Sequence, residues 1–150
     1  MNHDFETPSV TVGLEDTIIL ATYAHRGQFD KAGEPYICHP LRLMLTMSTL
    51  EERTVALLHD TVEDSPVTLN DLREAGYSSA VVEAIERLTH AEGVDYFDYV
   101  AKIKSNSLAT KVKMADLRDN MNLSRIAKPT MKDESRVEKY QKAMAMLEAK

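Results

Sequence analysis

The chain has 150 residues, of which 43% are hydrophobic and 28% charged, a composition that fits one soluble globular domain. No apolar run comes near the roughly 18 residues of a membrane-spanning helix, and residues 1–8 lack the apolar core of a secretory signal. The formal net charge of −6 argues against a nucleic-acid partner, because nucleic-acid binding needs a basic surface.

Apolar residues at helical spacing recur along the chain, whereas strand patterns are nearly absent. In chain order, helices are predicted over residues 14–28, 36–49, 51–64, 68–76, 79–88, 96–104, 108–126 and 133–150. Glycine and proline break the pattern after the first helix, which predicts a loop over 29–35. Thr68 and Asp71 form a capping-box pattern at the start of the short fourth helix, and Gly76 ends it.

The chain contains no internal repeat, linker or low-complexity tract. We therefore expect a single all-α domain, a compact bundle of several helices over residues 1–150, with about 1–12 as a flexible N-terminal end. Apolar residues of the last helix could cap this bundle or form a dimer contact, so a monomer and a homodimer both stay open. The single cysteine, Cys38, can form neither an intramolecular disulfide nor a Cys-x-x-Cys metal site, and a reducing cytoplasm is the expected location.

Histidine and acidic residues gather at the end of the helix predicted over 51–64. His59 and Asp60 follow an apolar stretch. Glu63 and Asp64 come four residues later, so the two pairs lie one turn apart on one helix face. Carboxylates are unfavourable there, because the macrodipole is negative at a helix C-terminus. One interpretation is a solvated acidic helix end, but a polar pocket with a bound cation explains the cluster better.

A second polar cluster lies on the helix predicted over 108–126. Its spacing puts Asp116, Asp119 and Asn120 on one face, and Lys113 lies one turn earlier. Such a face is usually solvated, but apolar residues are interspersed with this one. The helix therefore contributes a second set of candidate site residues.

His39 stands before Pro40 at the start of a predicted helix, where histidine is often only a local hydrogen-bonding residue. Two imidazoles and two carboxylates are nevertheless available from three predicted helices, in His39, His59, Asp60 and Asp116. Mixed nitrogen and oxygen ligands suit Mn²⁺, Fe²⁺, Co²⁺ or Zn²⁺ better than Ca²⁺, which prefers oxygen alone. Spacing alone does not bring these four residues to one point.

Four motifs occur in order from about residue 21 to residue 121. They are Ala24-His25-x-Gly27-Gln28, Lys31-x-Gly33-Glu34-Pro35-Tyr36-Ile37-x-His39-Pro40, His59-Asp60-x-x-Glu63-Asp64 and Lys113-x-Ala115-Asp116-x-x-x-Asn120-Met121. In this order and spacing the chain resembles the HD-domain hydrolases of RelA/SpoT type, and most of all their stand-alone form, the small alarmone hydrolases. The resemblance implies the all-helical HD fold and a bound metal ion, characteristically Mn²⁺. The implied ligands are His39, His59, Asp60 and Asp116.

The resemblance also implies a reaction on a small nucleotide. These hydrolases remove the 3′-pyrophosphate of guanosine tetra- or pentaphosphate, (p)ppGpp, which leaves GDP or GTP and pyrophosphate. Glu63 and Asp64 would be the catalytic pair that works on the attacking water. Nothing in the chain resembles the synthetase half of the longer family members, so hydrolysis alone is implied.

The substrate-binding residues implied by the resemblance are Lys31 and Asn120. Lys31, with Arg26 or Lys113, would offset the negative charge of the substrate. Asp30 stands where the family commonly has an arginine that stacks on the guanine base, and a carboxylate cannot make that contact. We therefore predict that Asp30→Arg improves guanine-alarmone hydrolysis by roughly tenfold in kcat/KM.

Two further positions depart from the family pattern: Asp119 replaces a histidine of the long members, and Asn122-Leu123 replaces a common Arg-Thr pair. The metal and catalytic positions are intact, whereas the base-reading positions are not. Two alternatives therefore stay open, namely an HD phosphohydrolase for another phosphorylated nucleotide and a non-catalytic nucleotide-sensing module. The intact pair of Glu63 and Asp64 argues against the sensing module, because a pure binder does not need it.

Overall fold

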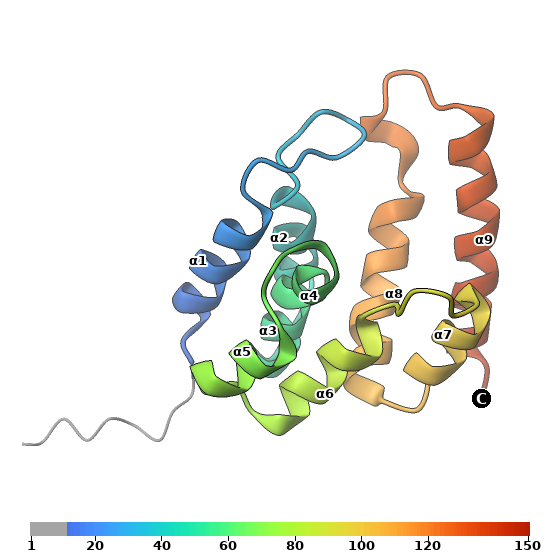
Figure 1. Ribbon diagram of the computed structural model, residues 1–150. Helices are drawn as coiled ribbons and strands as arrows, with labels where there is room; N and C mark the ends of the chain where they lie inside the picture. The colour runs from blue at the N-terminus through green and yellow to red at the C-terminus, as the bar shows by residue number, and fades with distance from the viewer. Residues whose placement is uncertain (1–11) are drawn as a thin grey trace, which may run out of the picture.

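The computed structural model describes residues 12–150, and this part of the chain is built from helices joined by short loops (Figure 1). The helices are α1 (Leu14–His25), α2 (Cys38–Leu45), α3 (Leu50–Leu58), α4 (Thr61–Asp64), α5 (Leu69–Ala75), α6 (Ser79–Leu88), α7 (Tyr96–Ile103), α8 (Ser107–Met121), the 3-10 turn η1 (Leu123–Arg125) and α9 (Met131–Glu148). The predicted all-α bundle is confirmed. The flexible end predicted over about 1–12 lies, except for Val12, outside the described residues.

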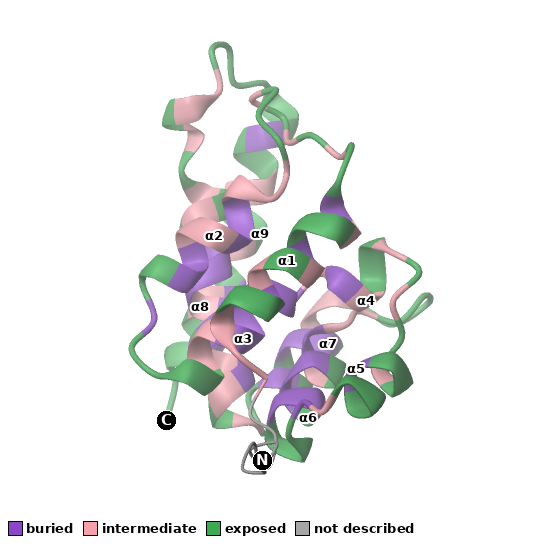
Figure 2. Cartoon of the chain, turned by 90° about the vertical axis from the view of Figure 1, so that its left-hand side faces the viewer, coloured by how far each residue is buried: buried purple, intermediate pink, exposed green. Residues whose placement is uncertain are grey.

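Helix α3 lies at the centre of the bundle and packs against α1, α2, α6 and α8. The last four residues of α3, Val55 to Leu58, are fully buried, and Figure 2 shows buried segments of the neighbouring helices around it. Burial of one leucine side chain contributes about 1.5–3 kcal/mol to folding. The C-terminal end of α3, where His59 follows, is therefore fixed in the interior by the core.

The helix predicted over 51–64 is wrong as one continuous element, because the chain turns at His59 and Asp60 between α3 and α4. Asp60 has backbone angles of φ −105° and ψ −1°, away from regular helical values. In a regular α-helix, consecutive side chains point about 100° apart. The turn instead lets two consecutive side chains approach one point, with His59 Nε2 lying 3.0 Å from Asp60 Oδ2.

Other boundaries follow local signals. The capping box at Thr68 and Asp71 is confirmed, since each side chain accepts a hydrogen bond from the other residue's backbone N–H. The first helix ends at His25, three residues before the predicted end, because Gly27 adopts a φ of 85° that continues no helix. The helix predicted over 108–126 ends at Met121 instead.

Helix α9 covers one side of the bundle by packing against α7 and α8, and Figure 1 shows α8 and α9 side by side. Its Ala143 and Leu147 are buried in the core of the same chain. The last helix therefore caps the bundle, which was one of its two predicted roles. Over residues 12–150, no helix combines the length and apolarity that crossing a bilayer would require.

Candidate functional site

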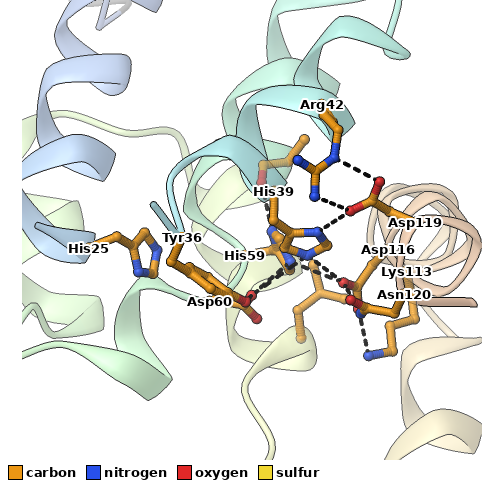
Figure 3. Close-up of polar contacts among 12 residues, drawn as sticks. His25, Tyr36, His39, Arg42, His59, Asp60, Lys113, Asp116, Asp119 and Asn120 are labelled. Carbon is orange, nitrogen blue, oxygen red and sulfur yellow. Dashed lines mark hydrogen bonds and ion pairs between the residues drawn. The ribbon is translucent and has the colours of Figure 1, made fainter. Parts of the chain in front are cut away.

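Two histidines and two aspartates from three parts of the fold meet at the centre of the molecule (Figure 3). One ligand atom from each of His39, His59 and Asp60 lies within 4.8 Å of the other two. Asp116 Oδ1, from α8, lies 2.8 Å from His39 Nε2 and 3.4 Å from His59 Nε2. The structure thus brings together all four predicted ligand residues, and their binding of a metal ion stays a prediction.

Both imidazoles are oriented through their Nδ1 atoms. His59 Nδ1–H donates to the carbonyl oxygen of Ala56 at 2.6 Å, and His39 Nδ1–H donates to Asp119 Oδ2 at 2.6 Å. The two Nε2 atoms are thereby turned toward the carboxylates. His59 Nε2 is buried and has no aligned hydrogen-bond partner, although Asp60 Oδ2 is near. A buried nitrogen in this position, within a set of two nitrogen and two oxygen donors, fits a transition-metal ligand.

The carboxylates attract positive charge to this centre. Burial lowers the pKa of His39, but hydrogen bonds to Asp116 and Asp119 outweigh burial and leave the pKa above its ordinary value. Burial lowers the pKa of His59 too, and the charges of Asp60 and Asp116 again reverse the direction. The same carboxylates would attract a divalent cation to this centre.

Three side chains next to the cluster hold its carboxylates in place. Tyr36 Oη–H donates to Asp60 Oδ2, Lys113 Nζ donates to Asp116 Oδ2 at 2.9 Å, and Asn120 Nδ2 donates to Asp116 Oδ1 at 2.9 Å. Burial lowers the pKa of Lys113, but the charge of Asp116, together with the other nearby groups, has a larger and opposite effect. The pKa therefore lies above its ordinary value, and this lysine stays charged. Lys113 is therefore paired with Asp116, and its predicted role toward the substrate charge stays a prediction.

A cavity of about 330 Å³ opens beside His39, between the loop after α1, the end of α8, η1 and the start of α9. Among the described residues, its wall carries four cationic side chains, those of Lys31, Arg42, Arg125 and Arg136. Both predicted substrate-binding residues, Lys31 and Asn120, line it, whereas Arg26 lies elsewhere. Their contact with a nucleotide stays a prediction.

The acidic pair lies on α4, directly after the turn that holds His59 and Asp60. Glu63 Oε1 accepts a hydrogen bond from the backbone N–H of His90 at 2.6 Å, and the carbonyl oxygen of Asp64 accepts one from Gln28 at 2.9 Å. Neither residue lines this cavity. Within residues 12–150, no side-chain hydrogen bond joins this pair to the ligand cluster, so the predicted catalytic role of Glu63 and Asp64 rests on their position one turn after the cluster.

The residues that depart from the family pattern have structural partners. Asp30 lines the cavity, and its Oδ1 accepts hydrogen bonds from the backbone N–H groups of Ala32 and Glu34, both at 2.9 Å. Asp119 accepts from His39 and from Arg42. Asp30 therefore holds the turn of the loop in addition to facing the cavity.

Sequence reasoning missed Tyr36 and Arg42 and gave Asp119 no role at the metal centre. Tyr36 and Arg42 each lie three residues from His39, which is about one helical turn and was an available signal. No local pattern shows the pairing of Arg42 with Asp119, because the two residues are 77 positions apart.

An all-helical bundle with a buried centre of two histidines and two aspartates defines an HD-type domain. Comparisons with known proteins agree. The chain is 31% identical over 134 residues to the guanosine-3′,5′-bis(diphosphate) 3′-pyrophosphohydrolase of Vibrio cholerae. This match covers 79% of the chain and 19% of that protein. It is 32% identical over 89 residues to the bifunctional (p)ppGpp synthase/hydrolase SpoT of Escherichia coli, covering 57% of this chain and 12% of that protein. The chain thus spans less than a fifth of these curated relatives.

The fold has a solved counterpart. A structure described as a metazoan ortholog of SpoT that hydrolyzes ppGpp superposes with a TM-score of 0.77, at 20% identity, over 93% of this chain and 88% of that one. No protein-family model matches the sequence. Sequence and fold together place the chain among the HD-type domains of the RelA/SpoT family, of whose curated members it matches only a part.

Proposed function

We propose that the chain is a metal-dependent hydrolase that removes the 3′-pyrophosphate of (p)ppGpp and uses Mn²⁺. The observation that carries the proposal is the meeting of His39, His59, Asp60 and Asp116 beside a cavity whose wall, within residues 12–150, carries four cationic and three acidic side chains. The names of the relatives support the substrate. The proposal includes a cytoplasmic location and leaves both a monomer and a homodimer open.

His39, His59, Asp60 and Asp116 would hold the ion. When bound, it lowers the pKa of a water molecule and neutralises phosphate charge. The surrounding contacts keep the donors in place: Lys113 and Asn120 fix Asp116, and the Tyr36 hydroxyl fixes Asp60. Tyr36 lies in the loop before α2, whereas Lys113 and Asn120 lie on α8, so the two carboxylates are oriented from different parts of the fold.

Glu63 and Asp64 would handle the proton of the attacking water. Partial burial raises the pKa of both carboxyl groups, and the nearby charge of Asp60 also raises it, which makes each a stronger base than a carboxylate of ordinary pKa. In the proposed hydrolysis, a bond forms between the water oxygen and phosphorus while the bond from that phosphorus to the ribose 3′ oxygen breaks. One proton leaves the water, and one is added to the departing oxygen.

The cavity wall would bind the phosphates. Asp119 and Asp133 are the carboxylates nearest to its cations, and each is paired: Asp119 with Arg42 and Arg125, and Asp133 with Lys31 at 3.4 Å. The cations therefore already neutralise these two carboxylates, which reduces their repulsion of a phosphate anion in the cavity. A volume of about 330 Å³ lies at the low end of the range for small-molecule sites.

The test is an assay of the purified protein with Mn²⁺ and ppGpp, with separation of products by ion exchange. We expect GDP and pyrophosphate in equal amounts from the wild type and from Glu138→Gln, an exposed change on α9, and none from Asp116→Asn. A second arm replaces ppGpp with its adenine counterpart. Faster hydrolysis of the adenine compound would favour a different phosphorylated nucleotide, which Asp30 in the cavity wall makes a specific alternative. Nucleotide binding without turnover would indicate a sensing module.

A further inference from the structure

His39 is held by a carboxylate outside the predicted ligand set. Asp119 Oδ2 lies 2.6 Å from His39 Nδ1, and His39 is only 3% exposed. A carboxylate oxygen with no proton can only accept, so Nδ1 carries a hydrogen, and in the protonated ring Nε2 carries one as well. The opposite ring nitrogen, Nε2, is thereby turned toward Asp116 and Asp60, at 2.8 Å and 4.0 Å.

Asp119 is itself clamped by two arginines. Arg42 donates through Nε to Oδ1 and through Nη2 to Oδ2, both at 2.9 Å, which is a bidentate pair. Arg125 Nη2 lies 3.3 Å from Oδ1 and also donates to the Asp119 carbonyl oxygen at 3.1 Å. The carboxylate therefore has a fixed orientation set by α2, α8 and η1, and Figure 3 shows it between Arg42 and His39.

We propose that Asp119, clamped by Arg42 and Arg125, is a positioning residue of the metal centre that fixes the tautomer and ring orientation of His39. The inference rests on the proposed metal site. Histidines that bind metals commonly donate their second N–H to a carboxylate or a carbonyl, and loss of that partner typically weakens metal binding 10–100-fold. His59 uses the backbone carbonyl of Ala56 for the same purpose. One histidine is thus oriented by its own helix and the other by a side chain from α8.

Arg42 also lines the cavity, so a direct contact with the substrate is the competing explanation. The two explanations differ in the absence of substrate. If Arg42 acts through Asp119, its loss weakens metal binding by the protein alone. The double variant Arg42→Met/Asp119→Leu then binds metal no more weakly than Asp119→Leu, because the two residues act in one chain of contacts. An arginine that only touches substrate leaves the metal affinity unchanged.

The experiment measures the Mn²⁺ affinity of each protein without substrate, from the concentration of free Mn²⁺ given by electron paramagnetic resonance. We expect Asp119→Leu to raise the Kd by about 10–100-fold. Asp119→Asn should raise it less, because its amide oxygen still accepts from Nδ1–H. Glu34→Gln is the matched control: its carboxylate lies 3.8 Å from Arg42 but touches no histidine, and its Kd should equal that of the wild type. Circular dichroism verifies the fold of each variant.

The outcomes separate this inference from the function on which it rests. Wild-type protein that binds no Mn²⁺ would overturn the metal site and this inference together. Mn²⁺ bound by the wild type, with the same Kd in folded Asp119→Leu and Asp119→Asn, would overturn the positioning role alone. If Asp119→Leu does not fold, Asp119→Asn decides, and its Kd must exceed that of Glu34→Gln.

Discussion

The ligand cluster and the cavity wall lie side by side but are built differently. The cluster is largely buried, and two of its residues, His59 and Asp60, directly follow α3, whose last four residues have no exposed surface. The wall is formed by a loop, η1 and the start of α9, and ion pairs such as Lys31 with Asp133 join its parts. Asp30 and Asp119, which depart from the family pattern, line this wall. The core thus positions the candidate ligand residues, whereas much of the cavity wall comes from loop and turn segments, which vary more easily among proteins.

The largest expected effect comes from removal of a cluster ligand. His59→Ala or Asp116→Ala should abolish both bound Mn²⁺ and turnover, while the helical far-ultraviolet spectrum remains. Metal content by atomic emission and circular dichroism measure the two properties. The exposed α6 variant Glu83→Ala is the control and should keep both. Stoichiometric Mn²⁺ in both ligand variants would refute the ligand assignment.

A second test separates catalysis from metal binding at the acidic pair on α4. The double variant Glu63→Gln/Asp64→Asn should reduce turnover by about 10²-fold or more, the contribution of a general base, and leave Mn²⁺ bound. Steady-state kinetics and metal content are measured on one preparation. Normal turnover would show that another residue takes the proton.

The third test concerns the wall. Because Asp30 also holds the turn of the loop, Asp30→Arg changes the charge and removes two hydrogen bonds at once. Asp30→Asn keeps an accepting oxygen and removes only the charge. A like charge about 4–6 Å from a phosphate costs on the order of 1–2 kcal/mol. We therefore expect Asp30→Asn to raise kcat/KM for ppGpp by up to about tenfold, at unchanged Mn²⁺ affinity. A fall in kcat/KM would mean that this carboxylate recognises the base.

The smallest effect tests how independent the cluster is of its surroundings. Glu52 at the start of α3 pairs with Lys111 of α8 at 2.9 Å. Hydrogen bonds from Lys111 and from the backbone N–H groups of Ser48 and Thr49 lower the pKa of Glu52 to about 2. A lowered pKa stabilises the fold above the ordinary pKa of 4.5, and this stabilisation is lost as the pH falls through about 2. Glu52→Gln should therefore lower the Tm by about 1–4 °C at neutral pH and by nothing near pH 2. Mn²⁺ affinity at neutral pH should not change.

Local signals predicted much of this fold, and the failures have a common cause. The helix over 79–88 and the capping box at Thr68 were predicted correctly, because their determinants lie within a few residues. The turn at His59 and Asp60 was not, since an apolar stretch followed by polar residues is compatible with a continuous helix. At this turn, side chains from α2 and α8 lie close to Asp60 and His59, and the local sequence does not show these contacts.

The candidate site divides in the same way. The four cluster residues were selected by chemistry and by resemblance to a family, and the structure brings them together. The contact between His39 and Asp119 joins positions 80 residues apart, and no periodicity within one helix indicates such a pair. Contacts of this kind follow from the packing of α2 against α8, which the sequence pattern does not specify.

The burial of α3 has a thermodynamic consequence for an ion at the centre. The histidine rings are already ordered by the core, so ion capture requires little additional loss of side-chain entropy. An ion that binds only the folded chain shifts the folding equilibrium by mass action, by about 2.7 kcal/mol at a free concentration of 100 times the Kd. For a chain of this length, that corresponds to an increase of about 5–10 °C in Tm. The Tm of this protein would then rise with the concentration of free metal ion, and a chelator would reverse the increase.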